Sequence, residues 1–183
     1  MRIAAVDLET TDLKAMMGVL LCGSFQPIGV DGPEGSPYTF RLALDPARPY
    51  DPDPDHMLAI DIRDQIERYN LIVTWNGKMF DIPFLNARLL FHRERPVAPQ
   101  FHVDLMYYAG YSANRIGSKR LISVQQFLQL PHEKTALDWE VWKRAARGDP
   151  AAMASVVTHC EADVTVLAEA WPRLLPYVKN IHR

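Results

Sequence analysis

The chain has 183 residues, of which 48% are hydrophobic and 23% are charged, and its formal net charge is -2. This length and composition suit an ordinary hydrophobic core, so residues 1–183 are expected to form a single domain. The near-neutral charge gives no sign of a polyanion partner, so any contact with nucleic acid needs a local basic patch.

The cysteines and the apolar segments bear on the cellular compartment. Cys22 and Cys160 have neither the spacing of a metal site nor that of a disulfide framework, which is typical of free thiols in a reducing cytosol. Residues 1–9 lack the features of a signal peptide. No apolar run in the sequence approaches the roughly 18 residues of a membrane span. A soluble, cytoplasmic protein without a membrane partner is therefore expected.

The first part of the chain predicts an antiparallel meander of three strands. These strands comprise residues 2–8, 18–25 and 38–44. Gly and Pro residues between 29 and 37 indicate a hairpin-like turn. The proline-rich residues 45–55 predict a loop, in which Asp53 or Asp55 could cap the following helix.

Strands then alternate with helices, which predicts a mixed α/β domain. Helices are expected over residues 56–69, 80–90, 123–130, 136–147 and 151–174, and strands over residues 71–75 and 101–105. Ser123 is the expected N-cap of its helix. Asp149 and Pro150 predict a capped start for the last helix, because proline suits the first helical position.

Asp7 and Glu9 stand two residues apart on the first predicted strand, so both side chains point to one face. Neighbouring carboxylates repel each other and are most stable at neutral pH when a cation compensates for their charge. The alternative is an edge strand with solvated acids, which the apolar neighbours of Asp7 argue against.

Asp81 follows the apolar strand and a turn that contains Asn76 and Gly77, and it opens a predicted helix. A carboxylate at this place can serve the helix N-terminus instead of a functional site. The presence of Asn76 and Phe80 in the same segment as Asp81 favours the functional interpretation.

His159 and Asp163 lie four residues apart on the last predicted helix and therefore share one face. With an unperturbed pKa of about 6.5, a histidine beside a metal-binding Asp can orient or deprotonate a water molecule. A surface pair is the alternative. Glu161 points elsewhere on this helix and is expected to be solvated.

The spacing of these acids is typical of phosphodiester hydrolysis assisted by metal ions. Two divalent cations about 3.5–4 Å apart can activate the attacking water and stabilise the leaving oxygen. Hard cations bind carboxylate oxygens and keep positions open for water and phosphate.

Three segments, in this order along the chain, carry a family resemblance. They are Asp7-Leu8-Glu9-Thr10-Thr11, the run from Asn76 through Phe80 and Asp81 to Leu85, and the run from His159 through Asp163 to Leu167. Together they resemble the DEDD superfamily of 3′–5′ exonucleases, whose fold is the RNase H-like fold of polymerase proofreading domains. One departure stands out: His159 occupies the spacing at which one branch of the family has Tyr, with three residues before the last Asp.

The resemblance implies an RNase H-like mixed sheet flanked by helices and a two-metal site. In that site Asp7, Glu9 and Asp163 bind the tighter Mg²⁺ or Mn²⁺ ion, and Asp7 bridges to a second ion held by Asp81. His159, in place of the phenol, positions or deprotonates the attacking water.

The implied activity is 3′–5′ exonuclease cleavage of single-stranded DNA. A 3′–5′ exoribonuclease of the same fold and a nucleic-acid-binding scaffold without activity are the alternatives. Any proofreading role would require a replication or repair partner in trans.

Contacts with the nucleic acid are expected from two regions. The first motif and the turn before Asp81 would meet the terminal nucleotides, and a basic loop, which could equally be a solvated loop, would grip phosphates. The residues concerned are Thr10, Thr11, Leu13, Asn76, Phe80, Arg115, Lys119 and Arg120.

Overall fold

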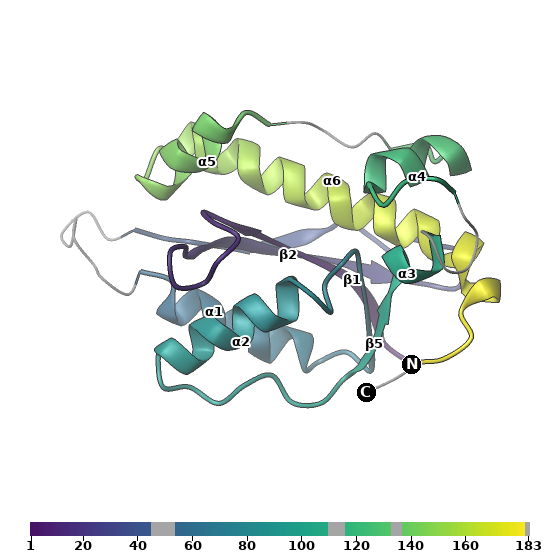
Figure 1. Cartoon of the computed structure of the whole chain (residues 1–183), viewed down its shortest axis with the longest axis horizontal. Helices are drawn as coiled ribbons and strands as arrows, with labels where there is room; N and C mark the ends of the chain where they lie inside the picture. The colour runs from purple at the N-terminus through teal and green to yellow at the C-terminus, as the bar shows by residue number, and fades with distance from the viewer. Residues whose placement is uncertain (45–53, 110–115, 133–136, 182–183) are drawn as a thin grey trace.

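A mixed sheet of five strands runs through the middle of the molecule, with helices on both of its faces (Figure 1). The computed structural model describes residues 1–44, 54–109, 116–132 and 137–181. The strands are β1 (Ile3–Thr10), β2 (Leu20–Ile28), β3 (Tyr38–Arg41), β4 (Leu71–Thr74) and β5 (Phe101–Asp104). The helices are α1 (His56–Ile66), α2 (Asp81–Phe91), α3 (Leu105–Ala109), α4 (Leu121–Leu128), α5 (Trp139–Ala146), α6 (Pro150–Leu174) and the 3-10 turn η1 (Leu175–Tyr177).

The strand order is β3-β2-β1-β4-β5, which places β1 at the centre of the sheet. β1 pairs antiparallel with β2, and β2 pairs antiparallel with β3. On its other side β1 pairs parallel with β4, which pairs parallel with β5. The predicted meander followed by alternating strands and helices is thus confirmed.

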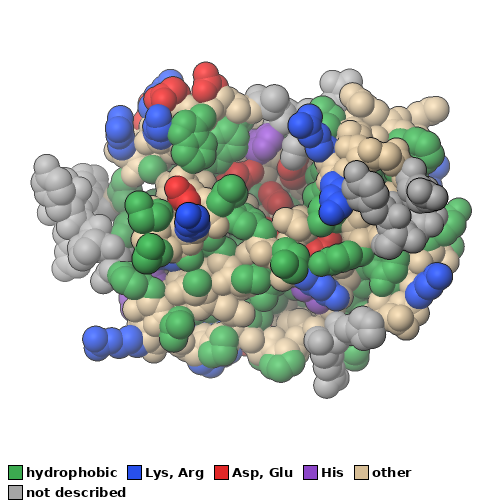
Figure 2. All heavy atoms as spheres, in the orientation of Figure 1, with side chains coloured by type: hydrophobic (Ala, Val, Ile, Leu, Met, Phe, Trp, Pro, Cys, Tyr) green, Lys and Arg blue, Asp and Glu red, His purple; other side chains and the backbone are tan. Residues whose placement is uncertain are grey.

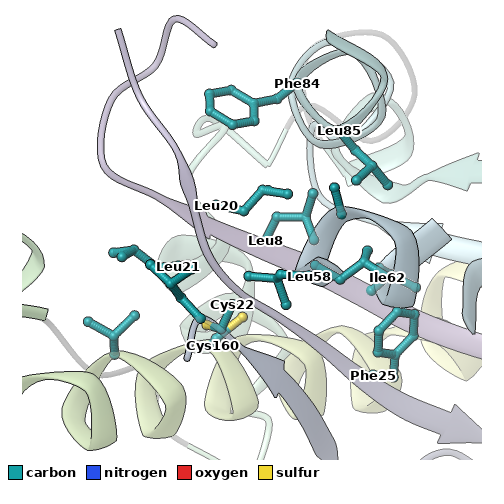
Figure 3. Packing of buried hydrophobic residues seen from close by; sticks show 14 of the residues in the cluster. Leu8, Leu20, Leu21, Cys22, Phe25, Leu58, Ile62, Phe84, Leu85 and Cys160 are labelled. Carbon is teal, nitrogen blue, oxygen red and sulfur yellow. The ribbon is translucent and has the colours of Figure 1, made fainter. Parts of the chain in front are cut away.

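Two apolar clusters fill the space between sheet and helices. One cluster joins β1 and β2 to α1 and α2 and continues to the first half of α6, as the packing of Leu8, Phe25 and Ile62 illustrates (Figure 3). Cys22 and Cys160 belong to this cluster as buried free thiols whose side chains point toward each other (Figure 3). The other cluster joins β4, β5, α3 and α4 to the second half of α6. The sheet is therefore covered on both faces.

The long helix α6 begins where the sequence predicts. The Asp149 side chain accepts hydrogen bonds from the N–H groups of Ala151 and Ala152, and Pro150 occupies the first turn. By length and composition, residues Pro150–Tyr177 could cross a membrane, although the sequence alone suggested no such run. However, 61% of the most apolar window is buried inside the protein, so the apolar face of α6 is explained by its packing on the sheet.

Several helix boundaries differ from those expected. Ser123 is not the N-cap of α4, because the helix begins at Leu121 and the Ser123 N–H already bonds to the carbonyl of Arg120. The short helix α3 was not predicted. It follows β5 directly because the Asp104 carboxylate accepts a hydrogen bond from Met106 N–H at its start. Most of the expected loop 45–55 lies outside the described residues.

Asp55 occupies the N-cap position of α1, but its side chain does not cap the helix. Its carboxylate instead accepts hydrogen bonds from Arg88 of α2, from His92 directly after α2 and from the Leu20 N–H of β2. Burial raises the pKa of Asp55, but these hydrogen bonds outweigh it, and the pKa lies below its usual value. Asp55 therefore ties α1, α2 and β2 together through a buried charge.

Candidate metal centre

Asp7 and Glu9 project from β1 toward the face of the sheet that α6 covers. The Cys160 sulfur of α6 lies 3.4 Å from the Asp7 carbonyl oxygen and 3.5 Å from Asp7 Oδ2. Potential ligand atoms of Asp7, Glu9 and Cys160 all lie within 4.8 Å of one another. Burial raises the pKa of the Cys160 thiol well above its ordinary value, so this group is a protonated neighbour of the two carboxylates.

Asp81 opens α2 and is buried against β1. Its Oδ1 accepts a hydrogen bond of 2.9 Å from the Leu8 N–H, which joins the start of α2 to the strand that carries the other acids. Burial raises the pKa of Asp81 to about 7, and repulsion from Asp104 and Glu9 adds to the effect. A carboxyl that gives up its proton reluctantly in the metal-free protein is suited to stabilisation by a cation.

His159 is buried and lies beside Glu9, so it is not a surface residue. Its Nε2 is 3.6 Å from Glu9 Oε1. The ring of Trp142, from α5, meets the imidazole edge to face with centroids 5.7 Å apart. The indole Nε1 also donates a 2.9 Å hydrogen bond to Glu9 Oε2. Sequence reasoning missed Trp142, since nothing local to residues 136–147 connects this indole to β1.

Asp163 is buried on α6, one turn beyond His159 and Cys160. Because residues three and four apart share a helix face, it lies on the side of α6 that packs over β1. Figure 2 shows Asp, Glu and His side chains gathered in a hollow near the middle of this face of the molecule. Glu161 was expected to be solvated, but it is half-buried and accepts a hydrogen bond from Thr39 of β3.

The turn between β4 and α2 is held rigidly next to the acids. Asn76 adopts a left-handed conformation with φ of 65°. The buried Asp104 carboxylate accepts hydrogen bonds from the N–H groups of Asn76 and Lys78. A Cβ atom on Gly77 would come within 2.5 Å of the Thr74 side chain, so only glycine fits there. The turn therefore presents Phe80 and Asp81 in a fixed orientation.

Beneath this turn, His102 of β5 bonds to Thr74 Oγ1 through Nε2 at 2.7 Å. Burial, with a smaller effect of the Lys78 charge, lowers the pKa of His102 to about 4. Since the unfolded histidine takes up a proton near pH 6.5, the folded state loses stability as pH falls from about 6.5 toward 4.

We expect wild type to lose about 3 kcal/mol more stability between pH 7 and pH 4 than His102→Gln, which cannot titrate. Urea unfolding at a series of pH values measures this difference. Equal pH slopes for the two proteins would contradict the assigned cause.

A hollow of about 230 Å³ opens beside the acids and is lined mainly by apolar side chains. Its lining residues are Leu8, Glu9, Thr10, Asp12, Leu13, Phe80, Trp139 and Trp142. Leu13 is 81% exposed and Trp139 is 51% exposed, so both offer apolar surface to a ligand. The Thr10 hydroxyl donates to the Asp12 carbonyl and the Thr11 hydroxyl accepts from the Val19 N–H, so both hydroxyls shape the β1–β2 loop.

Two of the three predicted basic residues lie on the surface near the turn. Lys119 and Arg120 are exposed, and the Trp75 indole of the Asn76 turn donates to the Lys119 carbonyl at 2.9 Å. Arg115 lies outside the described residues. Figure 2 shows Lys and Arg side chains along one side of the acidic hollow and hydrophobic side chains along the other.

Comparison with known proteins gives a family and a fold. The family model of the RNase H superfamily matches residues 5–171. The chain is similar in structure to a family B DNA polymerase from the hyperthermophilic archaeon Pyrobaculum calidifontis, with a TM-score of 0.71 and 17% sequence identity. The similarity covers 96% of this chain and 24% of the polymerase chain. No curated protein matches the sequence.

Proposed function

Since this chain belongs to the RNase H superfamily, we propose that it is a metal-dependent 3′–5′ exonuclease of the DEDD type that acts on single-stranded DNA. The membership and the sheet order bear out the RNase H-like fold expected from the sequence, and a nuclease-type hydrolase follows from that fold. The observation that carries the finer proposal is that Glu9 of β1 lies beside His159 of α6 and repels the buried Asp81 of α2, with Asp7 two residues away on the same strand. The site residues are Asp7, Glu9, Asp81, His159 and Asp163.

The residues of the centre fit a pair of hard divalent cations, Mg²⁺ or Mn²⁺. The donors are carboxylate oxygens, which these ions prefer. The raised pKa of Asp81 reflects burial first and then repulsion by like charges, and a bound cation would favour the ionised carboxylate against both. The nearby Cys160 thiol, whose pKa burial raises, is a soft donor that such hard cations do not prefer.

In this proposal Asp7, Glu9 and Asp163 would hold one cation, and Asp81 together with Asp7 would hold a second. Two such ions supply charge stabilisation for the attacking and leaving oxygens. His159 orients the attacking water and accepts its proton, for which its buried position beside Glu9 is suitable. The 3′-hydroxyl of the shortened strand leaves.

The hollow beside the acids takes the terminal nucleotide. Leu13, Phe80 and Trp139 offer apolar and aromatic surface against which a base or sugar can pack without sequence preference. The rigid turn at Asn76 contacts the preceding nucleotide. Lys119 and Arg120 bind phosphates of the strand as it leaves the site, and Arg115 is proposed to join them.

The test is degradation of 5′-labelled single-stranded DNA and of a matched RNA with Mg²⁺, Mn²⁺ or EDTA. We expect a ladder of shortened, labelled DNA products with either metal and no ladder with EDTA. For Asp7→Ala the cleavage rate should fall at least about 1,000-fold. Asp61→Ala, which removes an exposed acid of α1, is the matched control and should cleave at the wild-type rate.

Each other outcome would point to a different function. A ladder on RNA alone would identify an exoribonuclease. Immediate release of a labelled mononucleotide from DNA would show that cleavage starts at the 5′ end, which contradicts the proposed 3′–5′ polarity. Binding without cleavage of either strand would favour a scaffold that has the fold but not the activity.

A further inference from the structure

The helix α5 reaches the metal centre through one side chain, Trp142. Its indole Nε1 lies 2.9 Å from Oε2 of Glu9, a residue 133 positions earlier in the chain. Trp142 is half-buried and packs against the first apolar cluster. A partly buried indole N–H normally finds an acceptor, but here the acceptor is a carboxylate of the proposed metal centre.

The hydrogen bond constrains the orientation of the Glu9 carboxylate. Oε2 is held by the indole, while Oε1 faces the imidazole of His159 at 3.6 Å. The carboxyl group therefore cannot rotate freely about its last side-chain bond. Hydrogen bonds to charged acceptors are stronger than those between neutral groups, so this contact can fix a ligand before a cation arrives.

The same aromatic ring also restricts His159. The two rings meet edge to face at 84°, and this contact leaves the imidazole little room to turn away from Glu9. One residue thus touches both a proposed metal ligand and the proposed water-orienting group.

We propose that Trp142 is a positioning residue of the metal centre, whose N–H holds the Glu9 carboxylate and whose ring holds the His159 imidazole. The inference rests on the proposed function, because it assumes that Glu9 binds a cation. Groups that orient metal ligands from outside the coordination sphere typically change metal affinity or activity 10- to 100-fold when removed.

The test measures Mn²⁺ binding by calorimetry on metal-free protein without nucleic acid. Trp142→Phe keeps an aromatic ring but removes the N–H donor, and we expect Mn²⁺ affinity to fall about 10-fold or more. Trp171→Phe makes the same change at an indole of the apolar cluster that joins β4, β5, α3 and α4 to α6, and it should bind Mn²⁺ within about twofold of wild type. Thermal unfolding without metal checks that each variant folds.

A second variant separates the hydrogen bond from the packing. Benzothienylalanine at position 142, which has sulfur in place of the indole N–H and nearly the same shape, should weaken Mn²⁺ binding as Trp142→Phe does. Wild-type affinity in this variant, or in a folded Trp142→Phe protein, overturns the inference and leaves the proposed function standing. Wild-type protein that binds no Mn²⁺ overturns both.

Discussion

Asp81→Asn is expected to lower the exonuclease rate about 1,000-fold or more while leaving the metal-free protein at least as stable as wild type. The amide has the shape of the carboxyl group, and its oxygen can still accept the hydrogen bond from Leu8 N–H that joins α2 to β1. The substitution removes a buried acid whose pKa is raised to about 7 by burial and by repulsion from Asp104 and Glu9. The loss should therefore fall on catalysis and not on folding.

The measurement pairs single-turnover cleavage with urea unfolding, each with and without Mn²⁺. Wild type should gain stability from the bound ion, and Asp81→Asn should gain less, because a ligand that binds only the folded state stabilises it. Asp61→Asn, the same change at an exposed site, should resemble wild type in both experiments. A rate within tenfold of wild type would remove Asp81 from the catalytic centre.

The largest expected effect on stability is at Asp55. Asp55→Asn should lower the free energy of unfolding by about 3–5 kcal/mol, because it leaves the buried Arg88 guanidinium without its counter-charge. The Asp55 carboxylate is fully buried and accepts from Arg88 Nη2 at 2.7 Å and from His92 Nε2 at 2.8 Å. The loss should extend to all three elements that the carboxylate joins.

Urea unfolding at neutral pH tests this, with Asp64→Asn as the matched control. Asp64 is about half exposed and pairs with the exposed Arg95 and with the buried Arg63, which keeps Glu94 as a second partner, so its loss should cost less than about 1 kcal/mol. Because the pKa of Asp55 is lowered in the folded state, its contribution is present above the unfolded pKa of about 3.9. This stabilising contribution of Asp55 is lost as the pH falls through the lower pKa that Asp55 has in the folded state. Similar costs for the two variants would contradict the assigned role.

The sequence predicts this fold well where the signal is local. The strands β1 and β4 are short, largely apolar runs. The start of α6 is predicted by Asp149 and Pro150, whose capping effect involves only neighbouring residues. The start of α4 and the helix α3 were missed, because Arg120 contributes only its backbone carbonyl to α4 and the Asp104 side chain at the start of α3 is shared with the Asn76 turn.

The residues of the candidate site also divide into those that local sequence predicts and those that only the folded structure brings together. The acids could be identified because each stands at a defined place in its own strand or helix, such as Asp7 and Glu9 on one face of β1. The contact from Trp142 to Glu9 could not, since it joins segments 133 residues apart. Asp55 was expected to cap α1, yet its side chain pairs with α2, again because the partners are brought together only by folding.

The order of the elements has a consequence for synthesis of the protein on the ribosome. Within the described residues, all five strands of the sheet precede α6 in the chain. The chain is synthesised from its N-terminal side at about 5–20 residues per second. The strands on which α6 packs therefore emerge from the ribosome before this long apolar helix does. Such an order shortens the time in which the helix could aggregate or be captured by a membrane.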